Sequence, residues 1–130
     1  MVDILLVDDE PSIRFFYSDV LADAGHHVLE AACGCEALKM IEKDPPDLVL
    51  LDIKLRSESG LALLREIAGR YPHLPVLLLS AFVSFQDDYL CWLADGYVVK
   101  STDPTELLNQ VLRVLQQGKN RRTFAERQEL

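Results

Sequence analysis

The sequence predicts an α/β fold in which one parallel five-stranded sheet is flanked by five helices. Short apolar runs rich in branched side chains alternate five times with stretches whose apolar residues recur every three or four positions. The chain has 130 residues, of which 49% are hydrophobic, enough for one domain with one core. Regular alternation of strands and helices is typical of parallel sheets with right-handed crossovers.

The first part of the chain predicts two strands and two helices. Residues 4–7 are apolar and branched, which indicates a buried strand. Pro11 then stands where a helix begins, because a missing N–H costs nothing there. Gly25 ends this helix in the usual manner. Residues 27–31 predict an edge-like strand, and a short helix around residues 37–41 follows.

The remaining part predicts three strands and three helices. The strands are expected at residues 48–51, 76–79 and 97–99. The helices are expected around residues 63–68, at 83–93 with a weak pattern, and from Pro104 to Leu115. The run at 48–51 is continuously apolar, which indicates burial on both faces of the sheet.

Five such units fit the flavodoxin-like, doubly wound strand order 2-1-3-4-5. Another order stays open, because the sequence does not determine how strands pair. In the 2-1-3-4-5 order, ligands bind outside the carboxyl ends of the first and third strands. We expect the domain to span residues 1–117, and residues 118–130 to form a polar, basic tail or linker.

Charge and hydropathy exclude some classes of protein. The chain has 21 acidic and 13 basic residues, a net charge of −8. Residues 118–130 contribute four basic and two acidic side chains, so the acidic excess lies in the domain itself. An acidic surface argues against direct nucleic-acid binding. The sequence has no apolar run long enough to cross a membrane and no signal-peptide pattern, so we expect a cytoplasmic protein.

Ionisable or hydroxyl side chains follow four of the five predicted strands. Asp8 and Asp9 follow the first strand, Asp52 the third, Ser80 the fourth and Lys100 the fifth. Each alone has an ordinary explanation, such as helix capping or a solvated surface charge. Together they would meet at one edge of the sheet, where three carboxylates repel one another unless a cation lies among them. Oxygen ligands with room for water favour Mg²⁺.

A carboxylate cluster with a metal, a lysine and a hydroxyl is typical of phosphoryl transfer. Asp52 is the candidate nucleophile, because it ends the central strand. Asp8 and Asp9 would hold the metal, while Lys100 and Ser80 would each contact a phosphoryl oxygen. No glycine-rich phosphate loop follows the first strand, which argues against nucleotide binding.

Four motifs in the chain resemble those of response-regulator receiver domains. They are VDDEP at residues 7–11, LLDI at 50–53, LLSA at 78–81 and DGYVVK at 95–100. The resemblance runs from about residue 2 to residue 117, and the ordered set of motifs is highly specific.

This resemblance implies a phosphoacceptor of a two-component phosphorelay. Asp52 would take a phosphoryl group from a histidine kinase or a phosphotransfer protein, and the domain would catalyse only its own phosphorylation and slow dephosphorylation. Asp9 and Asp52 would bind Mg²⁺ directly, Asp8 more through water, and the carbonyl group of Lys54 would be a further ligand.

The resemblance also implies a conformational switch. Ser80 would move toward the phosphoryl group and Tyr97 would turn inward. The face made by residues 83–93, residues 97–99 and the last helix would then change and bind an unidentified downstream protein or a second copy of the chain.

Three features depart from the family pattern. Arg56 and Ser101 each stand where proline is common, and the segment from residue 80 to residue 100 is about two residues shorter than usual.

Lys54 and Phe82 each lie two positions beyond an active residue, where the family tunes dephosphorylation. Phe82 would either shield the phosphoryl group from water or pack in the core.

Three interpretations of the whole chain stay open. The first is a stand-alone switch that acts by binding another protein. The second is a receiver fragment of a longer response regulator or hybrid kinase, in which Thr123 and Glu126 form a capping box that opens a connecting helix. The third is a small Mg²⁺-dependent phosphatase with an aspartyl-phosphate intermediate, although no second acid follows Asp52 closely and no insertion could cover a substrate.

Overall fold

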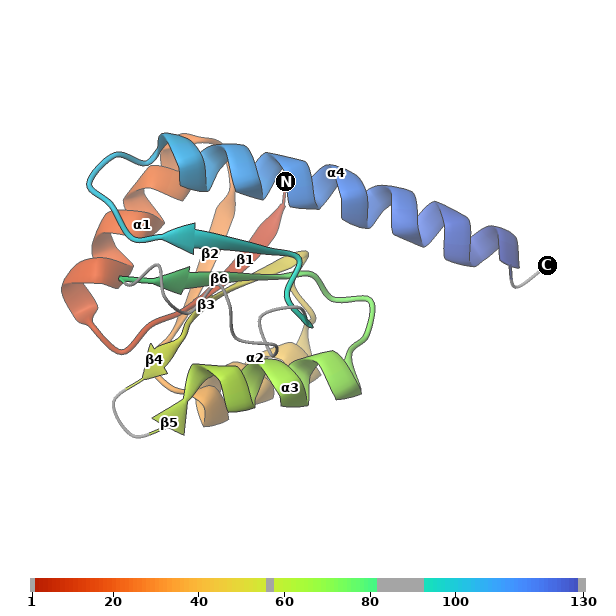
Figure 1. Ribbon diagram of the computed structural model, residues 1–130, viewed down its shortest axis with the longest axis horizontal. Coiled ribbons are helices and arrows are strands. Elements are labelled where there is room, and N and C mark those ends of the chain that lie inside the picture. Colours follow the sequence, from red (N-terminus) through yellow and green to blue (C-terminus); the bar gives the residue numbers. More distant parts are fainter. Residues whose placement is uncertain (1, 56–57, 82–92, 129–130) are drawn as a thin grey trace.

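The computed structural model describes residues 2–55, 58–81 and 93–128, and its centre is a five-stranded parallel sheet (Figure 1). The strands of this sheet are β1 (Asp3–Val7), β2 (His27–Ala31), β3 (Leu48–Asp52), β6 (Val76–Ser80) and β7 (Gly96–Val99). Their order across the sheet is β2-β1-β3-β6-β7, and every neighbouring pair is parallel. This is the predicted 2-1-3-4-5 order.

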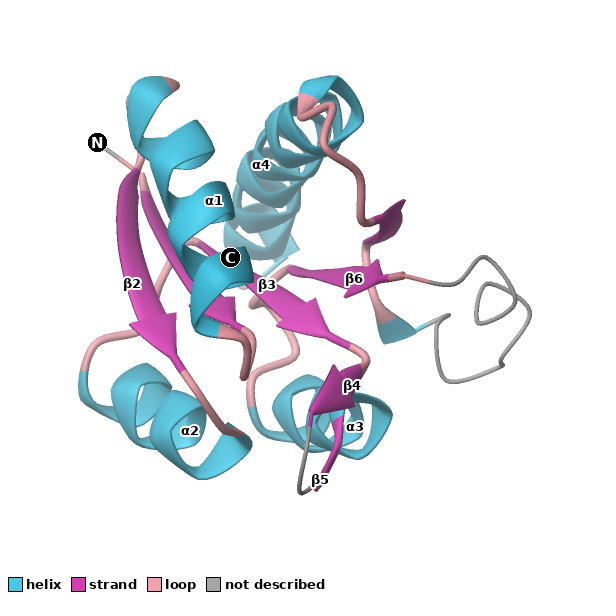
Figure 2. Cartoon of the chain, turned by 90° about the vertical axis from the view of Figure 1, so that its left-hand side faces the viewer, coloured by secondary structure: helices cyan, strands magenta, loops and turns pink. Residues whose placement is uncertain are grey.

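Four helices in the described part of the chain cover the sheet on both faces. They are α1 (Pro11–Asp23), α2 (Gly34–Lys43), α3 (Gly60–Arg70) and α4 (Thr105–Gln128). The helices α1 and α4 lie on one face of the sheet, and α2 and α3 lie on the other (Figure 2). The fold is therefore the doubly wound architecture that the sequence predicts.

The core consists of two apolar clusters, one on each face of the sheet. In β3, Val49 and Leu51 belong to the cluster under α2 and α3, whereas Leu48 and Leu50 belong to the cluster under α1 and α4. All four side chains are fully buried. Successive side chains of a strand point to opposite faces, so a strand covered on both sides must be apolar throughout.

Local sequence signals explain where several elements begin and end. Pro11 is the first residue of α1, as predicted. Gly25 follows this helix with a φ of 94°, a left-handed conformation that glycine adopts without steric cost. At α3, the hydroxyl group of Ser59 accepts a hydrogen bond from the backbone N–H of Ala62 at 3.3 Å and caps the helix.

The structure corrects the sequence-based prediction at the C-terminus. The helix α4 continues without interruption to Gln128, so Thr123 does not open a new helix and the capping-box prediction there is wrong. The cause is local: no proline follows Thr105 within the helix, and most residues beyond Leu115 favour helix. Whether residues 118–130 act as a linker stays a prediction.

A short antiparallel ribbon of β4 (Lys54–Leu55) and β5 (Glu58–Ser59) follows β3, and the sequence did not predict it. The helix predicted at residues 83–93 lies outside the described residues, apart from Leu93 at its end. Within the described chain, no peptide bond is cis and no helix is long and apolar enough to span a membrane.

Candidate functional site

The sheet brings the predicted site residues to the carboxyl edge of its central strands. Asp8 directly follows β1, Asp52 is the last residue of β3, and Ser80 is the last residue of β6. The register aligns these ends, because Asp52 lies beside Leu79 in β6 and Ser80 lies beside Val99 in β7. Parallel pairing alone therefore gathers polar residues that are far apart in the sequence.

Asp8, Asp9 and Asp52 form an acidic cluster at this edge. One carboxylate oxygen from each residue lies within 4.8 Å of the others. Asp8 is fully buried and Asp52 is only 5% exposed, whereas Asp9 is partly exposed. Three oxygen donors this close together suit a hard divalent cation such as Mg²⁺.

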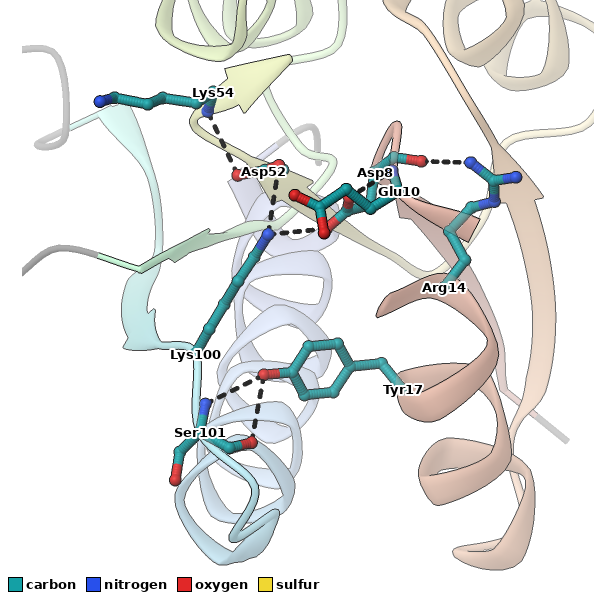
Figure 3. Close-up of polar contacts among 8 residues, drawn as sticks. All are labelled: Asp8, Glu10, Arg14, Tyr17, Asp52, Lys54, Lys100 and Ser101. Carbon is teal, nitrogen blue, oxygen red and sulfur yellow. Dashed lines mark hydrogen bonds and ion pairs between the residues drawn. The ribbon is translucent and has the colours of Figure 1, made fainter. Parts of the chain in front are cut away.

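Lys100 places its ammonium group between the two buried carboxylates (Figure 3). Its Nζ atom lies 2.9 Å from Oδ2 of Asp8 and 3.2 Å from Oδ2 of Asp52. Burial lowers the pKa of Lys100, but its hydrogen bond to Asp8 and the charges of Asp52 and Asp8 outweigh this effect, so the pKa rises above its usual value. The surroundings of Lys100 therefore favour its charged form.

For Asp52, the effect of burial on the pKa outweighs the effect of the neighbouring ammonium group. Burial raises its pKa, Lys100 lowers it, and the charge of Asp8 raises it again, so that the net direction is upward. The backbone N–H of Lys54 donates a hydrogen bond to Oδ1 of Asp52 at 3.2 Å and favours the ionised form. Asp52 is thus a buried carboxylate held in a fixed orientation beside an ammonium group.

Backbone contacts fix the loops that carry these side chains. The N–H of Glu10 donates to Oδ1 of Asp8 at 3.0 Å, which ties the turn after β1 to the acidic cluster. The N–H of Lys100 donates to the carbonyl of Ser80 at 2.7 Å and joins the ends of β6 and β7. Gly60 approaches β3 so closely that a Cβ atom there would overlap the carbonyl of Asp52.

Three further residues that the sequence analysis selected lie in the described part of the chain, namely Ser80, Lys54 and Tyr97. Ser80 is buried, whereas the side chain of Lys54 extends away from Asp52 and its backbone N–H donates a hydrogen bond to that residue (Figure 3). Tyr97 in β7 is half-buried and packs against the core cluster under α2 and α3. Phe82 and Arg56 lie outside the described residues.

Two residues on α1 that the sequence analysis did not select also reach this region. The Nη1 atom of Arg14 donates to the carbonyl of Asp8 at 2.6 Å, and its Nε atom lies 3.4 Å from the carboxylate of Glu30. A signal for Arg14 existed, because the first turn of a helix that follows β1 must lie near this edge. Tyr17 contacts Ser101 across 84 residues of sequence, and no local pattern indicates such a contact.

Comparisons with known proteins agree on one family. The family model for the response regulator receiver domain matches residues 4–112. The transcriptional regulatory protein BaeR of Escherichia coli is 34% identical over 122 residues, which are 92% of this chain and 50% of that protein. The probable transcriptional regulatory protein TcrX of Mycobacterium tuberculosis is 36% identical over 115 residues, 87% of this chain and 48% of that protein.

Solved structures give the same result. The response regulator protein TrrA of Thermotoga maritima, in complex with Mg²⁺-BeF, superposes with a TM-score of 0.85 at 38% identity, covering 88% of this chain and 99% of that one. A complex of TrrA with the histidine kinase ThkA gives a TM-score of 0.84 at 39% identity, with the same coverage. This chain spans about half the length of the curated relatives that it matches first.

Proposed function

This chain belongs to the response regulator receiver domains of two-component signalling, and we propose that it accepts a phosphoryl group on Asp52 in a Mg²⁺-dependent reaction. One observation carries the proposal. The buried carboxylate of Asp52 lies 3.2 Å from the ammonium group of Lys100 and within 4.8 Å of the carboxylates of Asp8 and Asp9. A nucleophile, a fixed cation and a set of metal-binding oxygens thus lie together at one end of the sheet.

Transfer would begin when a carboxylate oxygen of Asp52 attacks the phosphorus atom of the donor. The bond between phosphorus and the donor's leaving atom breaks, and the electron pair stays with that atom, which takes up a proton from water where it is basic enough to need one. Lys100 would turn part of its hydrogen bonding from Asp8 and Asp52 to a phosphoryl oxygen. The hydroxyl group of Ser80, at the end of the neighbouring strand, would contact another phosphoryl oxygen.

The acidic cluster fits Mg²⁺ by the chemistry of its donors. Asp9 and Asp52 would bind the ion directly, Asp8 more through water, and the carbonyl of Lys54 would be a further ligand. When bound, the ion supplies positive charge that offsets the charge of the carboxylates and of the phosphoryl group. The raised pKa of Asp52 supports this assignment, because a carboxylate crowded by burial and a second carboxylate gains most from an added cation.

The phosphoryl donor is proposed to be a histidine kinase or a phosphotransfer protein, in keeping with the TrrA–ThkA complex. Transfer would change the position of Lys100, which lies between β7 and α4, and of Ser80, whose carbonyl binds the N–H of Lys100. Together with an inward turn of Tyr97, this would alter the face made by residues 83–93, β7 and α4. A downstream protein or a second copy of the chain would bind there.

The charge of this chain and the length of its relatives both bear on nucleic-acid binding. The net charge of −8 favours a protein partner. The relatives are named as transcriptional regulators, and about half of their length lies outside the match. We therefore propose that this domain makes no direct contact with nucleic acid, and we extend this to no other part of a longer protein. We also propose that the domain lies in the cytoplasm.

Intact-mass measurement after incubation with a small phosphodonor tests the proposal. We expect the wild-type protein to gain one phosphoryl group, stable in acid and labile in base, only when Mg²⁺ is present. Asp52→Asn should abolish the adduct. Asp44→Asn is the matched control, because Asp44 is exposed and follows α2 outside the cluster, and it should behave as wild type. An adduct that persists in Asp52→Asn, or a wild-type protein that gains none, would overturn the assignment.

A further inference from the structure

Tyr17 forms a contact between α1 and the segment that carries Lys100. Its hydroxyl oxygen accepts a hydrogen bond from the backbone N–H of Ser101 at 3.2 Å and lies 3.5 Å from the carbonyl oxygen of Ser101, a weaker contact (Figure 3). Tyr17 is 2% exposed and belongs to the core cluster under α1 and α4. A hydroxyl group in such an environment needs a protein partner, and the backbone of Ser101 provides it.

This contact depends on the residue that follows Lys100. Proline has no backbone N–H, so a proline at position 101 would give Tyr17 nothing to accept from. Serine keeps that donor. Tyr17 and Ser101 therefore act as a pair, in which the helix side chain binds the backbone directly after Lys100.

The backbone around Lys100 is held from two sides. The N–H of Lys100 donates to the carbonyl of Ser80 at 2.7 Å, and the next N–H, that of Ser101, donates to Tyr17. From this fixed position the side chain of Lys100 reaches Asp8 and Asp52. Its ammonium group bridges two carboxylates at about 3 Å, so a shift of the backbone would move it out of this bridging position.

We propose that the hydroxyl group of Tyr17 is a positioning group for Lys100, holding the segment after β7 so that the ammonium group stays beside Asp52. This inference rests on the proposed phosphoryl transfer to Asp52. Tyr17 itself touches none of the reacting atoms. Its loss should slow transfer without weakening the acidic cluster, since Tyr17 makes no described contact with Asp8, Asp9 or Asp52.

Tyr17→Phe tests the proposal, because it removes one oxygen atom and leaves the ring in the core. The rate constant for phosphorylation is measured with a small phosphodonor at saturating Mg²⁺, well below the melting temperature, and the Kd for Mg²⁺ is measured by calorimetry. We expect the rate constant to fall about 5- to 10-fold, the effect of losing one neutral hydrogen bond. The Kd for Mg²⁺ should stay within about twofold of wild type, because its ligands are intact.

A purely structural role for Tyr17 predicts a different result. Ile41→Val is the matched control, since it removes one methyl group from the core on the opposite face of the sheet. It should lower the melting temperature while leaving the rate constant unchanged. If Tyr17→Phe also lowers only the melting temperature, the positioning role is wrong.

Amide hydrogen exchange gives a readout that needs neither metal nor phosphodonor. In Tyr17→Phe the amide proton of Ser101 should exchange about 5- to 10-fold faster than in wild type, whereas amides within β3 should not change. Unchanged exchange at Ser101 would overturn the inference. A wild-type protein that takes no phosphoryl group would overturn the proposed function instead, so the two failures are distinguishable.

Discussion

Replacement of Lys100 by methionine leaves two buried carboxylates without the cation that lies between them. The side chain of methionine fills a volume similar to that of the aliphatic part of lysine, so the change removes charge and hydrogen bonds more than packing. Asp8 and Asp52 are 0% and 5% exposed, and water cannot readily take the place of the ammonium group. The variant therefore tests whether electrostatic balance stabilises this end of the sheet.

The expected loss follows from two distances. With an effective dielectric constant of about 20, a pair of charges at 2.9 or 3.2 Å attracts with about 5–6 kcal/mol. The cost of burying Lys100 itself offsets much of this attraction, as its pKa balance indicates. Removal of one partner from a buried pair typically costs about 3–5 kcal/mol, and we expect the free energy of unfolding at pH 7 to fall by that amount.

The loss should depend on pH in a defined direction. Without Lys100, the pKa of Asp52 rises further above 3.8, because the main influence that lowers it is gone. A raised folded-state pKa means that the folded state binds more protons than the unfolded chain, so acid stabilises the variant relative to wild type. The difference between the two proteins should be largest at pH 7 and should narrow as the pH falls toward 4.

Urea unfolding followed by circular dichroism at pH 7 and pH 5 measures this difference. Lys39→Met is the matched control, since Lys39 is exposed on α2, and it should change the free energy of unfolding by less than about 0.5 kcal/mol. Added Mg²⁺ should stabilise Lys100→Met more than wild type, because it returns positive charge to the cluster. A loss below about 1 kcal/mol at pH 7, or an equal loss at pH 5, would refute the electrostatic argument.

Two further substitutions test other contacts of the site. Gly60→Ala should lower the free energy of unfolding by about 1–3 kcal/mol or more, because a Cβ atom would overlap the backbone of Asp52 and Ile53. The control is Gly69→Ala in the same helix, whose Cβ atom would meet nothing within 4 Å and which should be neutral or stabilising. Equal melting temperatures for the two variants would contradict this reasoning. Arg14→Gln should lower the free energy of unfolding, measured with denaturant, by about 1–2 kcal/mol, because it loses a charged hydrogen bond to the carbonyl of Asp8. The control Arg70→Gln breaks a half-exposed ion pair with Glu66 and should lower it by about 0–0.5 kcal/mol. A larger loss for Arg70→Gln than for Arg14→Gln would show that the Asp8 contact contributes little.

Much of the site could be predicted because parallel strands share their direction. Once the apolar runs had been identified, the residues after β1, β3, β6 and β7 had to meet at one edge. That argument found Asp8, Asp52, Ser80 and Lys100 without any knowledge of side-chain contacts. It works because the period of a strand and the position of its end are local properties of the sequence.

The contacts among those residues were decided only by the tertiary structure. Lys100 and Asp8 are 92 positions apart in the sequence. Lys100 bridges Asp8 and Asp52 instead of extending into solvent because of how β7 lies relative to β1 and β3. The same holds for Tyr17 and Ser101. A hydrogen bond between distant elements leaves no periodic trace, since either residue alone fits its helix or loop equally well.

The sequence by itself determined the alternation of strands and helices, the apolar strands of the centre and the edge at which the candidate site lies, because each follows from periodicity and from the geometry of parallel pairing. The tertiary structure decided which carboxylates are buried, where the ammonium group lies and which helix contacts the backbone after Lys100. Those features arise from the relative placement of whole elements, which the local pattern of the sequence does not encode.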